Sequence, residues 1–155
     1  MKTLVVAEHN NSELSAATLS VVEAAKKLGK DIDILVAGDS ASAVLEQAKS
    51  VEGVSQVLSF NDARFTNEIA EDLAECIVSV ADDYCYFLAS SSTTGKNNLP
   101  RAAALMDLQQ VSEVIEIIDD KTFKKPIYAG SCIATVKSDQ EKNVLTIRTT
   151  AFDKS

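Results

Sequence analysis

Short apolar runs alternate with amphipathic helical patterns over the first 108 residues, and this alternation restricts the fold more than any other feature. The strand-like runs are residues 3–7, 31–37, 56–60 and 84–89. The helical patterns between them cover about residues 14–28, 44–51 and 69–80. Strands that are separated by helices pair in parallel through right-handed crossovers. We therefore expect a three-layer α/β/α structure, in which helices cover both faces of a parallel sheet.

The pattern changes after residue 108. Four strand-like runs follow, with polar turns and no helical pattern between them: residues 113–118, 126–129, 133–136 and 144–148. Strands that follow one another this closely are usually antiparallel. We expect a single domain over residues 1–155, with a parallel core over about 1–108 and an antiparallel meander over about 111–149.

Charge and composition exclude several classes of partner. The chain has 155 residues, of which 46% are hydrophobic, and a formal charge of -8 with a pI near 4.6. Binding to nucleic acid or to an anionic membrane relies on clustered lysine and arginine, which this sequence does not show. The start of the chain has no signal-peptide pattern, and no apolar run is long enough to span a membrane. These features predict a cytoplasmic bacterial protein.

Three cysteines occur, Cys76, Cys85 and Cys132, at wide spacings within apolar runs. Their odd number and their spacing match neither a disulfide framework nor a metal site. We expect all three to be reduced thiols in the core.

Residues 89–108 form the most informative segment for function, because they follow a buried strand and open a helix. Ligands of open α/β sheets bind at this kind of position. The pair Gly95 and Lys96 resembles part of the phosphate-binding loop G-x-x-x-x-G-K-[ST]. However, Ser90 stands at the position of the first glycine, and Asn97 at that of the hydroxyl residue that binds magnesium. We therefore do not expect a metal-dependent NTPase, and we expect Pro100 in the first helical turn.

His9, the sole histidine, follows the first strand at the same edge of the expected sheet. A hydrolase would need a nucleophile that His9 could activate, and the sequence ties none to it. We interpret His9 as a capping or packing residue. The acidic pairs Asp82-Asp83 and Asp119-Asp120 are interpreted as solvated turns.

Five motifs in register resemble the N-terminal domain of the electron transfer flavoprotein alpha subunit. They are residues 3–9 (TLVVAEH), 35–38 (LVAG), 95–103 (GKNNLPRAA), 127–130 (IYAG) and 148–153 (RTTAFD). Each motif is short, but together they span nearly the whole chain.

The resemblance implies an adenine nucleotide alpha hydrolase-like, Rossmann-like fold. It also implies a heterodimer with a beta subunit, with one FAD bound between the subunits. This carrier would take electrons from acyl-CoA and other dehydrogenases, as in fatty acid beta-oxidation. It would pass them to a quinone oxidoreductase. The resemblance implies no catalytic site in this domain.

In the family the FAD site lies in the C-terminal domain of the alpha subunit, a domain that this sequence lacks. The related domain of the beta subunit carries an AMP, which the alpha domain is not expected to hold. The remaining candidate site residues are Lys96, Asn97 and Arg101, as contacts to a partner subunit or to the flavin domain. Arginine suits such contacts because its planar group pairs with carboxylates and stacks well. The alternative is a free-standing adenine-nucleotide-binding protein of the universal-stress type, with residues 90–96 as its phosphate loop.

Overall fold

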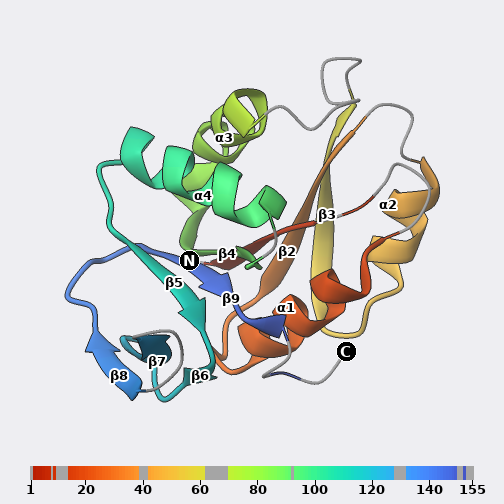
Figure 1. The fold of residues 1–155 in the computed structure, drawn as a ribbon. Helices are drawn as coiled ribbons and strands as arrows, with labels where there is room; N and C mark the ends of the chain where they lie inside the picture. Colours follow the sequence, from red (N-terminus) through yellow and green to blue (C-terminus); the bar gives the residue numbers. More distant parts are fainter. Residues whose placement is uncertain are drawn as a thin grey trace.

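A six-stranded parallel sheet forms the centre of the computed structural model (Figure 1). The structure describes residues 2–7, 9, 14–38, 42–61, 70–91, 93–127, 132–149 and 152. The order of the strands is β3-β2-β1-β4-β9-β5, and all neighbouring pairs run parallel. Their bounds are β1 (Lys2–Val6), β2 (Ile32–Gly38), β3 (Val54–Asn61), β4 (Tyr84–Ser90), β5 (Gln110–Val114) and β9 (Asn143–Ile147). Every residue of β4 and β9 is buried, as expected for strands covered on both faces.

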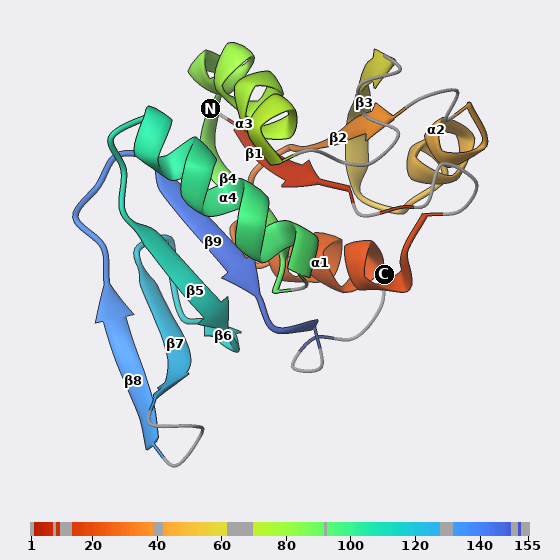
Figure 2. The same ribbon diagram turned by 45° about the horizontal axis from the view of Figure 1, so that its top comes forward.

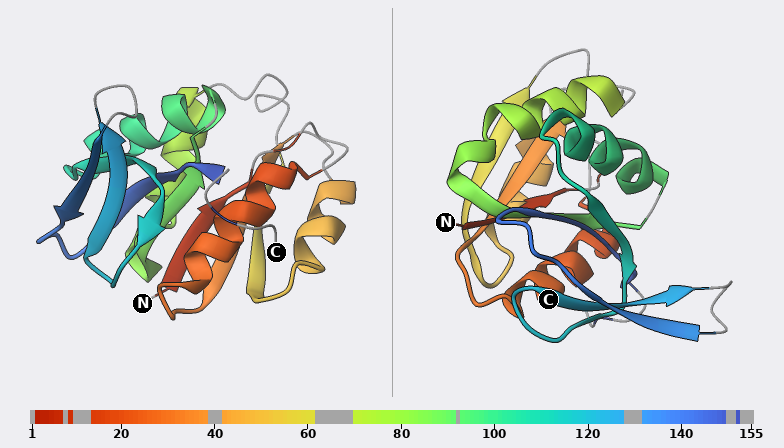
Figure 3. Two further views of the ribbon diagram at one scale, coloured as in Figure 1. Left: turned by 60° about the horizontal axis from the view of Figure 1, so that its bottom comes forward. Right: turned by 90° about the vertical axis from the view of Figure 1, so that its left-hand side faces the viewer.

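Helices cover both faces of this sheet, as Figure 3 (right) shows. They are α1 (Ala16–Lys26), α2 (Ser42–Lys49), α3 (Ala70–Ser79), the short 3-10 helix η2 (Ala81–Asp83) and α4 (Thr93–Leu105). Side chains of α1 and α2 pack in one core, and those of α3 and α4 pack in the other. Within β1, Val5 faces the first core and Leu4 the second, because successive side chains of a strand alternate in direction. The predicted three-layer fold is confirmed.

A small antiparallel sheet completes the fold. Its strands are β6 (Glu116–Ile117), β7 (Thr122–Ile127) and β8 (Cys132–Lys137), in the order β6-β7-β8. The β7–β8 hairpin extends away from the parallel sheet (Figures 2 and 3). The expected antiparallel C-terminal part is thus present.

The extent of the antiparallel pairing differs from the prediction of residues 111–149. Both β5 and β9 belong to the parallel sheet, where β9 lies between β4 and β5. Residues 115–142 form the connection between them, which is long enough for a parallel crossover. The sheet β6-β7-β8 occupies this crossover in the place of a helix. A sequence of closely spaced strands does not reveal that its last member returns to the central sheet.

The side chains of Phe123 and Tyr86 help to attach the antiparallel sheet to the parallel core. Phe123 on β7 is fully buried in the core on the α1 side, and it is the only buried residue among the described residues of β6, β7 and β8. The Tyr86 hydroxyl on β4 donates a hydrogen bond to the backbone carbonyl of Asp120, in the turn between β6 and β7. Apolar packing and a hydrogen bond therefore both contribute to the attachment of this sheet.

Alkaline pH is expected to weaken the Tyr86 anchor. Burial and the nearby carboxylate of Asp120 raise the pKa of Tyr86 from 10.0 to about 12. Because the folded pKa lies above the unfolded one, the contribution of Tyr86 is complete below about pH 10 and is lost as the pH rises toward about 12. The free energy of unfolding falls by about 1.4 kcal/mol for each unit by which the folded pKa exceeds the unfolded pKa.

Urea unfolding of the wild type and of Tyr86→Phe at several pH values tests this expectation. The variant is less stable near neutral pH, since it lacks the hydrogen bond, by about 1 kcal/mol. This difference should shrink and then change sign as the pH rises from about 10 to about 12, because the pH-dependent loss exceeds the contribution of the hydrogen bond. A difference that stays constant over this interval would contradict the assignment.

Candidate functional site

The carboxyl ends of β1 and β4 define the point where the chain's strand order changes direction, and ligands of such sheets bind there. Ser90 ends β4 and is buried, and the N–H of Ser91 donates to the carbonyl of Ile147 over 2.8 Å. The Ser91 hydroxyl is buried and has no hydrogen-bond partner among the described residues. His9 is also buried, and it forms an isolated antiparallel bridge with Leu14.

The segment after β4 does not have the geometry of a phosphate-binding loop. Helix α4 begins at Thr93, so that two residues connect it to Ser90. A phosphate loop needs a longer connection, whose N–H groups surround the anion. Gly95, Lys96 and Asn97 already belong to α4. Because Gly95 and Lys96 lie in the helix, the described residues do not form the phosphate loop that the adenine-nucleotide alternative expects over residues 90–96.

The start of α4 also corrects the expected position of Pro100. This residue lies inside the helix and not in its first turn. Proline lacks the N–H that would bond to the carbonyl four residues earlier, so it is usually excluded from helix interiors. The hydroxyl and amide residues before Pro100 are typical of a loop, but in the structure the helix includes them.

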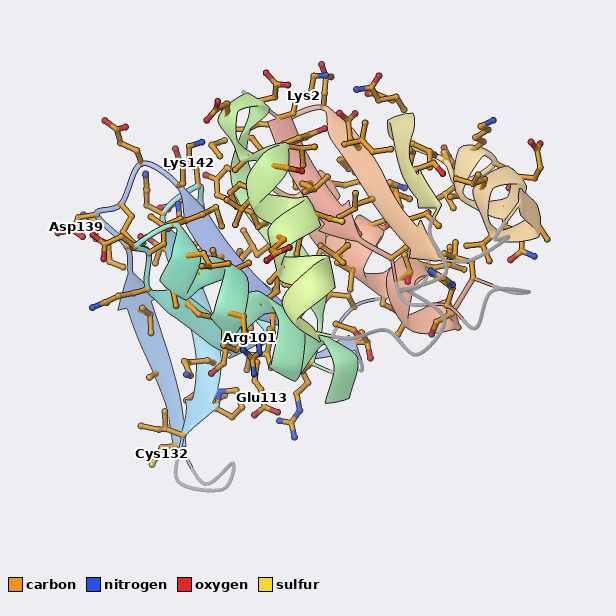
Figure 4. The ribbon with its side chains drawn as sticks, turned by 90° about the horizontal axis from the view of Figure 1, so that it is seen from above. Lys2, Arg101, Glu113, Cys132, Asp139 and Lys142 are labelled. Atoms are coloured by element: carbon orange, nitrogen blue, oxygen red, sulfur yellow. The ribbon has the colours of Figure 1, made fainter. Side chains whose placement is uncertain are left out.

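Of the three candidate contact residues, Arg101 can be placed in full. Its exposed side chain lies on α4 and lines a hollow of about 290 Å³ between α3 and α4, with Glu75 and Leu105 beside it. Leu105 is 61% exposed. The side chains of Lys96 and Asn97 lie outside the described part of the structure. Figure 4 looks onto this helical face and labels Arg101. An arginine side chain beside exposed apolar surface is typical of a protein interface.

The cysteines are free thiols, but only Cys76 and Cys85 lie in the core. Cys132 is exposed at the start of β8, where Figure 4 shows it at the far end of the hairpin. The expectation of three core thiols is therefore wrong for Cys132, because its apolar neighbours belong to a projecting hairpin. Among the described residues no group of His, Cys, Asp or Glu side chains could hold a metal ion. Asp82 and Asp83 are exposed before β4, as predicted.

A buried carboxylate that the sequence analysis did not single out lies at the opposite edge of the sheet. Asp33 on β2 is fully buried. Its Oδ2 accepts hydrogen bonds from the Tyr84 hydroxyl at 2.6 Å and from Gln56 Nε2 at 2.9 Å, and it lies 3.4 Å from Lys2 Nζ. Burial, followed by the hydrogen bond to Asp33, raises the pKa of Tyr84 far above its usual value. A charged residue within an apolar central strand was the signal available in the sequence, since such a group requires partners.

This network has a structural role in the geometry observed. Lys2 and Tyr84 are the first residues of β1 and β4, so the network lies at the amino ends of the strands. Figure 4 labels Lys2 at this edge, apart from Arg101. Ligands of open parallel sheets bind at the carboxyl ends instead. No helix in the described part of the chain has the length and hydropathy needed to cross a membrane.

Comparison with known proteins agrees with the resemblance found in the motifs. The profile of the family described as "Electron transfer flavoprotein domain" matches residues 3–155. The chain belongs to the electron transfer flavoprotein family. It is 50% identical to the electron transfer flavoprotein subunit alpha of Pseudomonas aeruginosa, over 99% of this chain and 50% of the relative. Identity to the subunit alpha of Paracoccus denitrificans is 44%, again over 99% of this chain and 50% of that protein.

A mitochondrial subunit alpha from Dictyostelium discoideum is 41% identical, over 98% of this chain and 45% of its own length. The chain thus spans about half the length of the curated relatives that it matches. Together, the family match and the coverage support an electron transfer flavoprotein alpha role for this fold.

Proposed function

We propose that this chain is the N-terminal domain of an electron transfer flavoprotein alpha subunit, which binds a beta subunit and supports the flavin domain. The match to subunit alpha relatives over nearly all of this chain and about half of theirs carries the proposal. The whole carrier would move electrons from acyl-CoA and other dehydrogenases to a quinone oxidoreductase in a bacterial cytoplasm. Bound FAD supplies one-electron and two-electron transfer.

We assign no flavin contact to the described residues of this domain. The role of this domain would then be to bind protein surfaces. No catalytic residue is assigned, because His9 is buried in an isolated bridge with Leu14 at the end of β1.

The α3–α4 face around Arg101 is the surface that we assign to the beta subunit, with Lys96 and Asn97 on the same helix as further candidate contacts. Arginine is enriched at binding hot spots, and the exposed side chain of Leu105 adds apolar area that a partner could bury. Truncation of a hot-spot residue costs about 2 kcal/mol or more, or roughly a thirtyfold loss of affinity.

Calorimetric titration with a beta subunit tests this assignment. We expect the wild-type chain to bind one beta subunit, and Arg101→Glu to bind roughly thirtyfold more weakly. The matched control is Lys49→Glu, which makes the same change of charge on α2, where Lys49 is exposed on the opposite face of the sheet. Equal affinities for the wild type and both variants would exclude Arg101 from the interface.

A further inference from the structure

The outer edge of β8 is an open strand edge. The sheet order β6-β7-β8 leaves β8 with a neighbour on one side only, among the described residues. The Ser138 N–H donates to the Lys121 carbonyl over 2.7 Å. This bond shows that Lys121 and Ser138 are a hydrogen-bonded pair, and it sets which of the following pairs exchange hydrogen bonds. Because these pairs alternate along the ladder, the N–H and C=O groups of Ile133, Thr135 and Lys137 point away from β7.

Strand β7 carries a proline at a position where the strand has no neighbour on one side. Pro126 lies opposite Ile133, at a position where a proline costs the β7–β8 ladder no hydrogen bond. The position of its missing N–H faces away from β8, on the part of β7 that extends beyond the end of β6. Proline at such a position blocks the addition of a strand. No proline occurs in β8, so its outer edge can accept another strand.

The face of the hairpin that points away from the core carries an exposed apolar side chain, Ile133, among polar and basic ones. Phe123 and Val136 lie opposite each other and pack toward the core on the α1 side. The alternate pair, Pro126 and Ile133, therefore projects to the other face. Ile133 is 62% exposed. A partner strand on β8 would cover this side chain in addition to satisfying the edge.

Charge indicates the chemistry of the partner strand. Residues 121–137 contain four lysines and no aspartate or glutamate, although the whole chain carries a formal charge of -8. Lys124 pairs with Glu116 across β6 and β7 at 3.4 Å, while Lys137 ends the open edge of β8. Two copies of this basic hairpin would repel each other. An extended segment with carboxylates would be attracted.

We propose that β8 binds an extended acidic segment of the beta subunit, which adds as a further strand along the edge formed by Ile133, Thr135 and Lys137. This inference rests on the function proposed above and specifies how part of the subunit contact is made. Main-chain hydrogen bonds would supply affinity, and the lysines and Ile133 would supply selectivity.

Thr135→Pro tests the strand addition. It removes one outward N–H and leaves the β7–β8 hydrogen bonds in place. Thr135→Val is the matched control, because it keeps the N–H. For the 155-residue chain titrated with the beta subunit, we expect Thr135→Pro to raise Kd about tenfold or more and Thr135→Val to leave it nearly unchanged. Amide exchange at Ile133, Thr135 and Lys137 should slow in the wild-type complex.

Lys137→Glu tests the charge without altering the backbone, and Lys30→Glu, in the turn before β2, is its control. We expect only Lys137→Glu to weaken binding, with the larger effect at low salt. If the wild-type chain binds but the three amides stay unprotected and Thr135→Pro binds equally well, strand addition is wrong and the proposed function stands. If the wild-type chain does not bind the beta subunit, both proposals fail. A self-associated chain that Thr135→Pro converts to monomer would overturn the choice of partner.

Discussion

Phe123→Ala is expected to lower the free energy of unfolding by about 3–5 kcal/mol, the usual range for truncating a buried aromatic residue. Phe123 is fully buried, and the other described residues of β6, β7 and β8 are at most partly buried. The apolar attachment of the antiparallel sheet therefore depends mainly on this one side chain. The change should also increase amide exchange in β7 and β8 more than in β4.

Urea unfolding followed by far-ultraviolet circular dichroism measures the effect, since the chain contains no tryptophan. Phe123→Leu is the control, because it retains most of the apolar volume and should cost less than about 1.5 kcal/mol. A loss below about 1 kcal/mol for Phe123→Ala, which a large cavity does not permit, would show that other contacts hold this sheet.

Asp33→Ala is expected to lower the free energy of unfolding by about 3 kcal/mol, because hydrogen bonds to a charged group contribute about 1.5–3 kcal/mol each. The variant removes the acceptor of Tyr84 and Gln56. The Tyr84 hydroxyl, in a side chain that is 2% exposed, would then lose its carboxylate acceptor. Asp33→Asn should cost less, because its amide oxygen can still accept from Tyr84.

A double-mutant cycle with Tyr84→Phe separates the pair from the rest of the site. The sum of the losses of unfolding free energy in the two single variants should exceed the loss in the double variant by about 1–3 kcal/mol, as for residues that share a hydrogen bond. Additive losses would mean that the Asp33–Tyr84 contact contributes nothing of its own. In that case the burial of Asp33 would have to be balanced by Lys2 and Gln56.

The layers of this fold follow from the sequence because each strand and each helix has its own period. The run from Tyr84 to Ala89 is apolar at every position, as a strand covered on both faces must be. Its neighbour β9 has the same buried character, yet its pairing was not predicted. Spacing along the chain suggests antiparallel neighbours, whereas partner choice in a sheet is decided by long-range contacts that a local pattern does not contain.

The candidate site was predicted in part. The sequence placed Arg101 on a helix after β4, and the structure adds the hollow against α3 and the exposed Leu105. It did not reveal that Gly95 and Lys96 are already helical, because helix propensity disfavours both glycine and the following asparagines. Nor did it reveal Asp33, since the partners Gln56 and Tyr84 are distant in sequence. Polar contacts between distant residues require the fold first.

We propose that this chain binds a beta subunit but holds no flavin of its own. Native mass spectrometry of the chain, produced together with the beta subunit, tests both parts in one measurement. We predict a complex of one chain with one beta subunit, and a free chain whose mass includes no FAD. A chain that stays unassociated, or that carries one FAD when alone, would contradict this account.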